Sequence, residues 1–559
     1  MDNIRVILWA LFASLIYVSY IVWQQDYAPD SAAETVAEQP ASADLPASAQ
    51  TSVPTDPSSA QPNDGELPAA VGASTPESSA ASGGKRIRVV TDVLDIEIST
   101  TGGSLVSADL PAYPLNKDNP DIPVTLLTNK NGEVYELRSG LRSAAQPPLA
   151  EATHLAEFSA ASDEYVLGDG QDELIVPLVW EQGGVRVEKT YIFKRGFYGI
   201  GMVQSVANNS GSDYPLFSYL QLQRTYTPVE RSMFNVDSYS FDGPVVFDGE
   251  SYDKLDAEDL TDEPLSGSYK NGWVAAIEHH FLSAAIPAGT ESSAYTGTFD
   301  GDKYTLTVAS PVVVVPNGQI KEISANFFIG PKLQSQMEEV ADGLKLTVDY
   351  GILALLAQPL FWLLQFVHKF IGNWGWTIII VTFLIKLAFY KLTETSGRSM
   401  AKMRKLQPRL KALQDRHKDD RPAMSAALMD LYKREKVNPA AGCLPMLVQI
   451  PFFIAFYWVL LESVEMRQAP FMLWITDLSS RDPFFILPLL MGAAMFVQQK
   501  LNPAPPDPIQ AKVMSVLPVV FTVFFAFFPA GLVLYWLTNS VLSILQQWKI
   551  NRAVIAEQG

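Results

Sequence analysis

Lys386 lies within a largely apolar stretch of the sequence that runs from Ile378 to Tyr390. A cation near the centre of a membrane helix costs about 2.5 to 3.5 kcal/mol on insertion scales, so it needs polar partners or water. Thr382 precedes Lys386 by one helical turn and lies on the same face of the predicted helix. Polar residues also occur within later apolar stretches: Gln449, Thr522, Thr538, Asn539 and Ser543. Together these side chains could line a wet cavity inside a membrane, where polar groups keep hydrogen-bond partners.

A second interpretation of Lys386 assigns it no such role. It precedes Tyr390 by four residues and Leu392 by six, so its long side chain could extend to the cytoplasmic interface. Gln449 and Asn539 could likewise form helix-to-helix hydrogen bonds, which contribute about 0.6 kcal/mol each on average. The residues alone leave both interpretations open.

Catalytic chemistry finds little support in the sequence. The phosphate-binding pattern GxxxxGK[ST], the metalloprotease pattern HExxH and the hydrolase pattern GxSxG do not occur. The adjacent residues His279 and His280 would point to opposite faces of a strand, which indicates structural roles. The single cysteine, Cys443, excludes an internal disulfide and leaves little scope for a thiolate metal site. We expect no enzymatic activity, no catalytic residue, no metal and no cofactor.

Charge is distributed very unevenly along the chain. The formal net charge of -19 argues against general nucleic-acid binding, which needs a basic surface. Residues 24–84 contain nine acidic residues and no lysine or arginine, whereas residues 391–442 contain thirteen lysines and arginines against six acidic residues. Basic loops stay on the cytoplasmic side of a membrane, so residues 391–442 are predicted to be cytoplasmic.

The N-terminal part is predicted to be an anchor and a tether. Residues 6–23 carry no charge and follow Arg5, which indicates a retained transmembrane anchor over residues 1–25 with a cytoplasmic N-terminus. A cleaved signal peptide is the alternative, although its apolar region is usually about 7 to 15 residues long. Residues 26–85 are rich in alanine, serine and proline, so they are predicted to form a disordered periplasmic tether.

From Arg86 onward, apolar and polar residues alternate as in β-strands. Such alternation is clear from Val185 to Phe193, and Gly102-Gly103 is typical of a turn between strands. Residues 86–330 are therefore predicted to form one periplasmic β-sandwich domain. A helix from about Leu333 to Thr347 should connect it to the rest of the chain.

The segment over residues 331–372 is predicted to hold this connecting helix and an interfacial amphipathic helix. Residues 350–370 are apolar but contain Gln358, Pro359 and Gln365. If they crossed the membrane, the basic segment at residues 391–442 would lie on the periplasmic side. That would contradict the positive-inside rule, by which basic loops stay in the cytoplasm. We therefore place residues 350–370 in the interface.

Residues 373–550 are predicted to contain five membrane spans. These are Trp374–Leu392, Leu444–Leu461, Phe484–Val497, Val513–Phe528 and Ala530–Leu545. Three of them have only 14 to 16 residues, below the roughly 20 that cross a typical hydrocarbon core. With the N-terminal anchor the total is six, both termini are cytoplasmic, and residues 551–559 form a cytoplasmic tail.

A cytoplasmic helical hairpin is predicted over residues 396–437, because apolar residues recur there at three- and four-residue spacing. They are Met400, Met403, Leu406, Leu410 and Leu413, then Met424, Leu428 and Leu431. Its candidate docking residues are Lys402, Arg404, Lys405, Arg409 and Lys411, which could meet ribosomal RNA or anionic lipid. The alternative is a solvated basic loop that only fixes topology.

The helical part resembles the YidC-type membrane protein insertases of Gram-negative bacteria, which belong to the YidC/Oxa/Alb family. The resemblance covers residues 373–386 (NWGWTIIIVTFLIK), 400–408 (MAKMRKLQP), 431–457 (LYKREKVNPAAGCLPMLVQIPFFIAFY), 467–479 (RQAPFMLWITDLS) and 528–539 (FPAGLVLYWLTN). It implies a membrane α-helical insertase core with six transmembrane helices in total, plus an all-β periplasmic supersandwich domain.

The resemblance also implies a polar client groove open to cytoplasm and lipid, formed by Lys386, Thr382, Gln449, Trp536 and Asn539. That family usually has an arginine where Lys386 stands, so the charge is kept while the bidentate fork is lost. Trp536 stands where relatives can have tyrosine. The implied partners are newly made membrane proteins, the Sec translocon and inner-membrane lipids, with the ribosome and the signal recognition particle receptor as further candidates.

Two other classes of function are alternatives. An ion- or proton-coupled transporter could use Lys386, although paired intramembrane carboxylates and inverted repeats are not evident. An envelope glycan-binding protein could use the β-sandwich, but a fold alone does not determine function.

Overall fold

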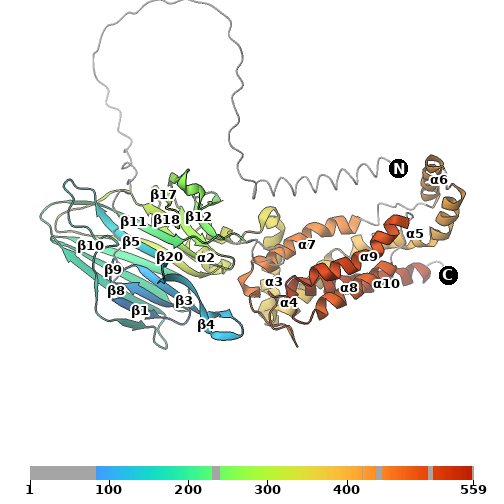
Figure 1. Cartoon of the computed structure of the whole chain (residues 1–559), viewed down its shortest axis with the longest axis horizontal. Helices are drawn as coiled ribbons and strands as arrows, with labels where there is room; N and C mark the ends of the chain where they lie inside the picture. Colours follow the sequence, from blue (N-terminus) through green and yellow to red (C-terminus); the bar gives the residue numbers. More distant parts are fainter. Residues whose placement is uncertain (1–83, 229–239, 418–419, 436–443, 502–507, 557–559) are drawn as a thin grey trace, which may run out of the picture. The chain divides into compact units, whose positions relative to one another are not determined.

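The computed structural model describes residues 84–228, 240–417, 420–435, 444–501 and 508–556 (Figure 1). The predicted anchor, nearly all of the predicted tether, and Cys443 lie outside these residues. The segment Pro408–Val437 belongs to a different compact unit from the β domain and the other described helices. Within the described residues, strands β1 to β20 come first and helices α2 to α10 follow.

The β domain consists of two sheets, as the alternating sequence predicted. The eleven-stranded sheet contains β1 (Arg86–Val90), β2 (Asp95–Ser99), β3 (Leu105–Asn116), β4 (Asn119–Lys130), β5 (Glu133–Ser143), β7 (Glu164–Val166), β11 (Tyr214–Thr225), β14 (Leu265–Tyr269), β17 (Ser293–Phe299), β18 (Lys303–Ala309) and β19 (Val313–Val315). The nine-stranded sheet contains β6 (Ser159–Ala160), β8 (Glu173–Gln182), β9 (Val185–Lys194), β10 (Gly199–Asn208), β12 (Gly243–Phe247), β13 (Tyr252–Lys254), β15 (Trp273–Ile277), β16 (Phe281–Pro287) and β20 (Ile320–Pro331).

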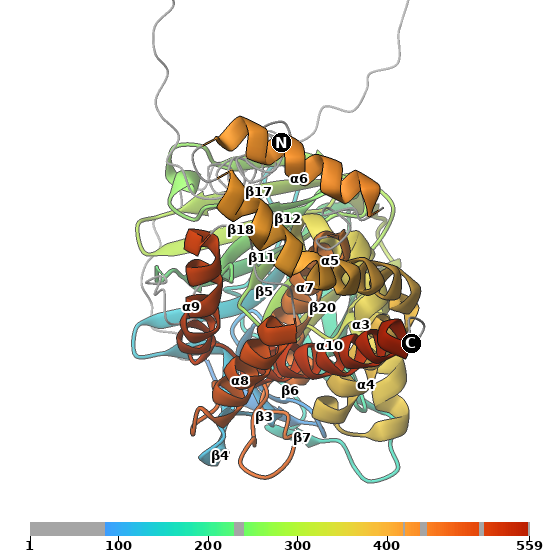
Figure 2. The same ribbon diagram turned by 90° about the vertical axis from the view of Figure 1, so that its right-hand side faces the viewer.

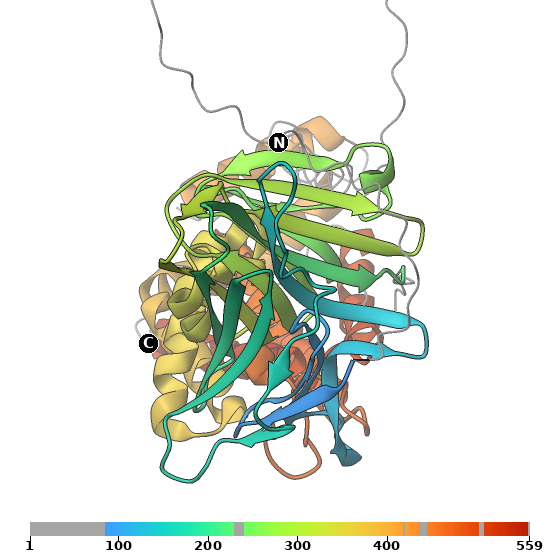
Figure 3. The same ribbon diagram turned by 90° about the vertical axis from the view of Figure 1, so that its left-hand side faces the viewer.

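Neighbouring strands in both sheets run antiparallel, except that β1 pairs with β7 in parallel. In the larger sheet, β14 lies at one edge and β7 at the other. Figure 3 shows the strands of this domain in blue to yellow-green. Side chains from both sheets, including Tyr191, Phe327 and Tyr304, are fully buried in the layer between them. A sandwich with a shared core is the arrangement that alternating strands favour.

Strand β9 shows how this alternation works and where it admits an exception. Val185, Val187, Tyr191 and Phe193 are buried as expected, but the same inward-facing row includes Lys189. The Nζ of Lys189 donates to three oxygens: the Gly102 carbonyl at 2.6 Å, the Ser139 carbonyl at 3.0 Å and the Ser139 hydroxyl at 3.0 Å. Burial lowers the pKa of Lys189 to about 7, because the charged form is poorly solvated there.

The prediction that His279 and His280 point to opposite faces of a strand is wrong. Both residues lie in the turn between β15 and β16, and their rings stack with centroids 3.8 Å apart. The Nε2 of His279 lies 3.1 Å from the carbonyl oxygen of Leu461. Burial lowers the pKa of His279 to about 4, so the ring is neutral near pH 7 and its Nε2–H can donate to that carbonyl.

The connection after the β domain is two short helices instead of the predicted single one. Helix α2 (Gln334–Val340) ends before Gly343, whose φ is 75°, and the 3₁₀ turn η3 (Leu344–Thr347) follows. A Cβ on Gly343 would lie 2.5 Å from the ring of Phe247, so the turn needs a glycine both for space and for its left-handed backbone. Trp273 Nε1 also donates to the Asp342 carbonyl at 3.0 Å, which holds this turn against the β domain.

The remaining helices occur where the apolar stretches and the helical spacing of residues 396–437 predicted them. They are α3 (Ala354–Ile371), preceded by η4 (Gly351–Leu353), then α4 (Trp374–Ala388), α5 (Tyr390–Arg416), α6 (Arg421–Arg434), α7 (Leu444–Glu462), α8 (Ile486–Leu501), α9 (Pro508–Phe525) and α10 (Ala530–Ala556). Short 3₁₀ turns η2 (Asp259–Thr261) and η6 (Val464–Met466) lie in the loops. Helix α10 packs against α4 and α8, α9 packs against α8, and α3 packs against α4 and α7 (Figure 2).

Two helices differ most from the predicted spans, while the bounds of α8 and α9 differ from them by two to five residues. The expected span Trp374–Leu392 is interrupted at Phe389, where the path bends by 67° between α4 and α5. Helix α10 continues to Ala556, eleven residues beyond the predicted end at Leu545.

The helices that qualify as membrane spans by length and composition are not the same as those chosen from the distribution of charge. Among the described residues, one unbroken helix, Gly351–Ile371, is long and apolar enough to cross a membrane. The bent pair of α4 and α5 passes the same test together, and three shorter apolar helices are Val448–Glu462, Ile486–Leu501 and Lys512–Phe525. The structure thus gives apolar helices at the expected positions without establishing the total of six spans.

Candidate functional site

Three helices bring polar side chains together around Lys386. Helix α4 contributes Lys386 and, one turn earlier, Thr382, while α7 contributes Gln449. Helix α10 contributes Asn539 and Ser543, which are four residues apart and therefore share a face. Four of the five predicted groove residues thus meet at one place: Lys386, Thr382, Gln449 and Asn539.

A chain of hydrogen bonds connects these helices. The Nζ of Lys386 donates to the Ser543 hydroxyl at 2.8 Å and to the Gln449 Oε1 at 3.4 Å. The Nε2 of Gln449 then donates to the Asn539 Oδ1 at 2.7 Å. These acceptors are neutral, so within the part of the chain that the structure describes the lysine is hydrogen-bonded without a carboxylate.

The cavity beside this chain is small. It measures about 20 Å³, close to the roughly 10 to 15 Å³ that one water molecule requires. Its wall also includes apolar and aromatic side chains, among them Ile385, Phe389 and Tyr535. Phe389 meets Phe452 of α7 edge-on, with ring centroids 5.0 Å apart, so an aromatic contact lies beside the polar network.

The fifth predicted groove residue, Trp536, has a different environment. It packs against Phe453 of α7, with ring centroids 4.3 Å apart, and against Phe525 of α9 at 5.2 Å. Among the described residues, the wall of the cavity contains the neighbouring Tyr535 and not Trp536. Trp536 therefore lies in an aromatic cluster between three helices, and its predicted role in the groove stays a prediction.

Sequence reasoning missed Tyr535, and it named Ser543 among the possible cavity residues without including it in the groove set. Tyr535 and Ser543 each lie four residues from Asn539, on opposite sides along the helix, so all three share one face of α10. Thr522, by contrast, donates its hydroxyl to the Pro518 carbonyl of its own helix at 2.7 Å. A polar residue in an apolar helix can thus satisfy itself locally, and helical spacing from a known site residue discriminates better than polarity alone.

The predicted hairpin residues lie on α5. Lys402 and Lys405 are exposed, and Arg409 Nη1 forms an ion pair with Glu435 Oε1 at 2.6 Å. Arg404 and Lys411 also belong to α5, but their side chains lie outside the described residues. Helix α6 is capped by Asp420, whose Oδ1 accepts from the Ala423 N–H at 2.9 Å. Both predicted hairpin helices are therefore present, with α5 beginning before the expected boundary.

Contacts also connect the β domain to the periphery of the helical part. Arg467 Nη2 donates to the Pro114 carbonyl at 2.9 Å, and Gln468 Nε2 donates to the same oxygen at 3.0 Å. The Ser240 hydroxyl donates to Glu462 Oε1 at 3.3 Å, at the end of α7. Several hydrogen bonds therefore connect the β domain to the end of α7 and the loop that follows it.

These features define a protein with a bundle of apolar helices around a lysine-centred cavity and a β-sandwich domain. The profile of the 60Kd inner membrane protein family matches residues 366–557, and that of the YidC periplasmic domain matches residues 86–363. A membrane protein insertase YidC from Thioalkalivibrio sulfidiphilus is 48% identical over 565 residues, covering 99% of both chains. Another from Methylococcus capsulatus is 46% identical over 559 residues, again covering 99% of both.

A crystal structure described as an active YidC insertase, with its first transmembrane domain resolved, covers 82% of this chain and 92% of its own. Its TM-score is 0.37 and its sequence identity is 18%. The full-length sequence relatives establish that the chain belongs to the YidC family of membrane protein insertases. The predicted resemblance is confirmed, and the chain is an inner-membrane protein with a periplasmic domain. This assignment takes the place of the transporter and glycan-binding alternatives.

Proposed function

We propose that this chain inserts and folds other membrane proteins in the inner membrane, using the Lys386 cavity to receive a polar client segment. The observation that carries the proposal is the bonding of Lys386 to the neutral groups of Ser543 and Gln449. A cation held by neutral acceptors keeps its attraction for an acidic client residue, whereas a carboxylate partner would cancel it. This bonding also favours a groove role over extension of Lys386 to the interface.

Entry of a client is an exchange of hydrogen bonds. The cavity has room for about one water, so a client segment must separate the Lys386–Gln449 and Gln449–Asn539 contacts before it can enter. Each lost bond is replaced by one to the client, and such exchanges cost little net free energy. The client's polar groups thereby avoid pure hydrocarbon, where each unsatisfied group costs several kcal/mol. No step in this exchange needs a nucleotide.

Release into lipid follows the apolar surface beside the cavity. On α7, Ile450 and Ile454 are exposed and lie one turn apart, next to Gln449. Helix α9 exposes a further apolar set: Val513, Val516, Val519, Val520 and Val523. A client's apolar helix can move along such surfaces into the bilayer, driven by burial of apolar area at roughly 25 cal/mol per Å². The membrane potential assists acidic residues in the translocated segment.

The proposed topology has six spans, with both termini in the cytoplasm. Five of the spans correspond to α4, α7, α8, α9 and α10, and the sixth is the N-terminal stretch. Placing α3 in the interface keeps the basic residues 391–442 cytoplasmic, in agreement with the charge distribution of membrane proteins. The exposed aromatic residues Trp362, Phe366 and Phe370 give α3 an apolar face suited to that position.

Reconstitution tests the proposed function. The purified chain alone, in liposomes, is given a short client resembling a phage coat protein, and protease protection of the client is measured. We expect protection of the translocated segment without nucleotide. Protein-free liposomes give the spontaneous background, and protection no greater than that background refutes the proposed function.

The cytoplasmic hairpin is proposed to dock clients, the ribosome or the signal recognition particle receptor, with the Sec translocon as a further partner in the membrane. The exposed positions of Lys402 and Lys405 support this role, because a basic surface attracts RNA and acidic proteins. Deleting residues 399–436 should abolish client delivery in cells while leaving the protein in the membrane. If topology and insertion both survive the deletion, the segment is a solvated basic loop.

A further inference from the structure

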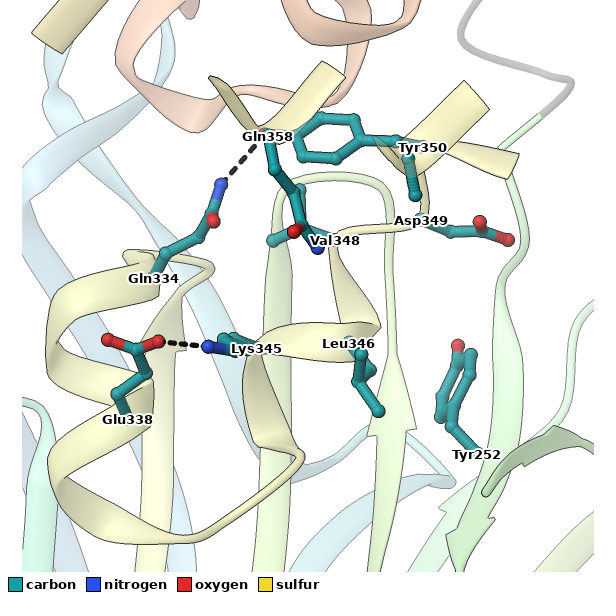
Figure 4. Close-up of a pocket in the computed structure, with 10 residues that line it drawn as sticks. Tyr252, Gln334, Glu338, Lys345, Leu346, Val348, Asp349, Tyr350 and Gln358 are labelled. Carbon is teal, nitrogen blue, oxygen red and sulfur yellow. Dashed lines mark hydrogen bonds and ion pairs between the residues drawn. The ribbon is translucent and has the colours of Figure 1, made fainter. Parts of the chain in front are cut away.

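A second cavity, of about 380 Å³, lies between the end of the β domain and the first turns of α3 (Figure 4). Its wall is formed by Tyr252 of β13, Glu338 of α2, Lys345 of η3, Asp349, and Gln358 of α3. This volume is more than twentyfold larger than the roughly 10 to 15 Å³ that one water molecule requires. A group of several heavy atoms therefore fits.

Two ion pairs give the cavity charges of both signs. Lys345 pairs with Glu338, and Lys254 Nζ pairs with Asp349 Oδ2 at 2.7 Å. Lys345, Glu338 and Asp349 all belong to the wall of the cavity, and their side chains are between two-fifths and just over half exposed. Exposed ion pairs contribute only about 0 to 1 kcal/mol, so a ligand can replace their mutual contacts at little cost.

A polar atom in the wall has no hydrogen-bond partner within the described part of the chain. The hydroxyl of Tyr252 is buried and has no hydrogen-bond partner among the described residues. Figure 4 shows this hydroxyl pointing towards the side of the cavity where Asp349 lies. A buried hydroxyl left unpaired costs about 1 to 3 kcal/mol, so a ligand that bonds to it gains by doing so.

The cavity adjoins an apolar surface that continues along the helix. Ile352 and Leu355, in the same turns as the wall residues, are 80% and 86% exposed. The exposed aromatic face of α3 follows them, and the helix Gly351–Ile371 has the apolar composition of a membrane segment. A ligand with a charged head and apolar chains matches both surfaces at once.

We propose that this cavity binds the headgroup of a zwitterionic aminophospholipid. The phosphate contacts Lys345, the primary ammonium contacts Asp349, and the acyl chains lie along Ile352 and Leu355. The Tyr252 hydroxyl bonds to an oxygen of the headgroup. The bound lipid thereby anchors the segment between the β domain and α3 at the membrane surface.

The charges of the wall decide between headgroups. A purely anionic headgroup would face the carboxylates of Glu338 and Asp349, which repel it. A choline headgroup carries no N–H and cannot donate to a carboxylate, whereas an ethanolamine headgroup donates charge-assisted hydrogen bonds. The site should therefore prefer phosphatidylethanolamine to phosphatidylcholine and phosphatidylglycerol.

Native mass spectrometry of the full chain in detergent tests this site, with each of the three lipids titrated separately. Soluble glycerophosphoethanolamine forms a fourth arm, because it carries the same headgroup without acyl chains. The variants are Lys345→Gln and Asp349→Asn; the asparagine keeps an acceptor for the Gly351 N–H, which Asp349 now accepts at 2.7 Å. Lys303→Gln is the matched control, because Lys303 also forms an ion pair, with Asp300, elsewhere on the β domain.

We expect one phosphatidylethanolamine to bind at concentrations where the other two lipids do not. Each cavity variant should weaken that binding about tenfold, the effect of losing roughly 1.4 kcal/mol, while Lys303→Gln leaves it unchanged. Equal binding of all three lipids, or wild-type binding by either cavity variant, overturns the proposal. Glycerophosphoethanolamine binding as tightly as the lipid would identify a soluble ligand and also overturn it.

Discussion

Lys189 in the β domain and Lys386 in the helical part are both hydrogen-bonded to neutral oxygens, but the oxygens differ in kind. Lys189 is fully buried, and two of its three acceptor contacts are to backbone carbonyls, those of Gly102 and Ser139. Lys386 is half-buried, and its acceptors are side chains from two other helices. Backbone oxygens move only when a strand moves, whereas a hydroxyl or an amide turns away by rotating one or two bonds. Release of Lys189 would therefore require movement of the backbone, whereas the proposed transfer of Lys386 to a client requires only side-chain rotations.

The largest expected effect concerns the charge of Lys386. Lys386→Arg should retain insertion, Lys386→Ala should reduce insertion of clients with acidic translocated segments about tenfold, and Lys386→Glu should be worst because like charges repel. The measurement is protease protection of the client in liposomes at equal protein content. Lys500→Ala is the control, since Lys500 is a lysine at the end of α8 outside the cavity. Equal insertion by the Ala and Glu variants would remove Lys386 from the mechanism.

Photocrosslinking sharpens the same comparison by locating the client. A photoreactive residue in place of Thr382 or Gln449 should label a client in transit, because both positions line the cavity. The same residue in place of Trp536 should label less, since that position lies in the aromatic cluster of three helices. Labelling at exposed Val519 of α9 but at neither cavity position would show that clients bypass the cavity.

Truncation of Lys189 should lower the stability of the β domain and leave client insertion unchanged. Lys189→Ala removes the donor for two buried carbonyls and opens a cavity, so we expect a loss of about 2 to 5 kcal/mol in the β domain. Lys189→Met keeps the volume and should lose less. Hydrogen exchange of the β9 amides in the full chain measures the effect locally. Wild-type protection of β9 in the Ala variant would contradict the assigned packing role.

The effect that is smallest over a single pH unit is a dependence of β-domain stability on pH. The folded pKa of Lys189, about 7, lies below its ordinary value of 10.5, so between these values the unfolded state binds more protons. The free energy of unfolding should therefore rise as pH increases through this window, by at most about 1.4 kcal/mol per pH unit. Urea unfolding followed by tryptophan fluorescence at several pH values, with Lys189→Met as reference, isolates this contribution. An identical pH dependence in both proteins would exclude Lys189 as its source.

The sequence predicted most of the elements because periodicity determines which faces are buried. Strand alternation at Val185–Phe193 and the apolar stretches of the helices both correspond to elements of the structure. It also predicted that Lys386, Thr382, Gln449 and Asn539 belong together, since a polar group in an apolar helix needs partners. The structure brings them together, and their role in insertion stays a prediction.

The rest depended on contacts that no local pattern contains. Lys189 is inward-facing by alternation, but only the approach of the Gly102 and Ser139 carbonyls explains how a lysine is tolerated there. The need for a glycine at position 343 reflects the ring of Phe247, nearly a hundred residues earlier, which would lie 2.5 Å from a Cβ there. The stacking of His279 on His280 requires a turn where a continuous strand was expected. Each difference reflects a tertiary neighbour that overrides local preference.

The 67° bend after α4 has an electrostatic consequence for Lys386. Because α4 ends at Ala388, Lys386 lies in the last turn of a helix, where the aligned peptide dipoles leave a partial negative charge. A cation at such a position gains roughly 0.3 to 1 kcal/mol, and up to about 2 kcal/mol when it is partly buried. A straight helix continuing to Leu392 would place that negative end further along the chain. The bend therefore contributes backbone stabilisation to the charge of Lys386, which the positive end of α5, beginning at Tyr390, offsets in part.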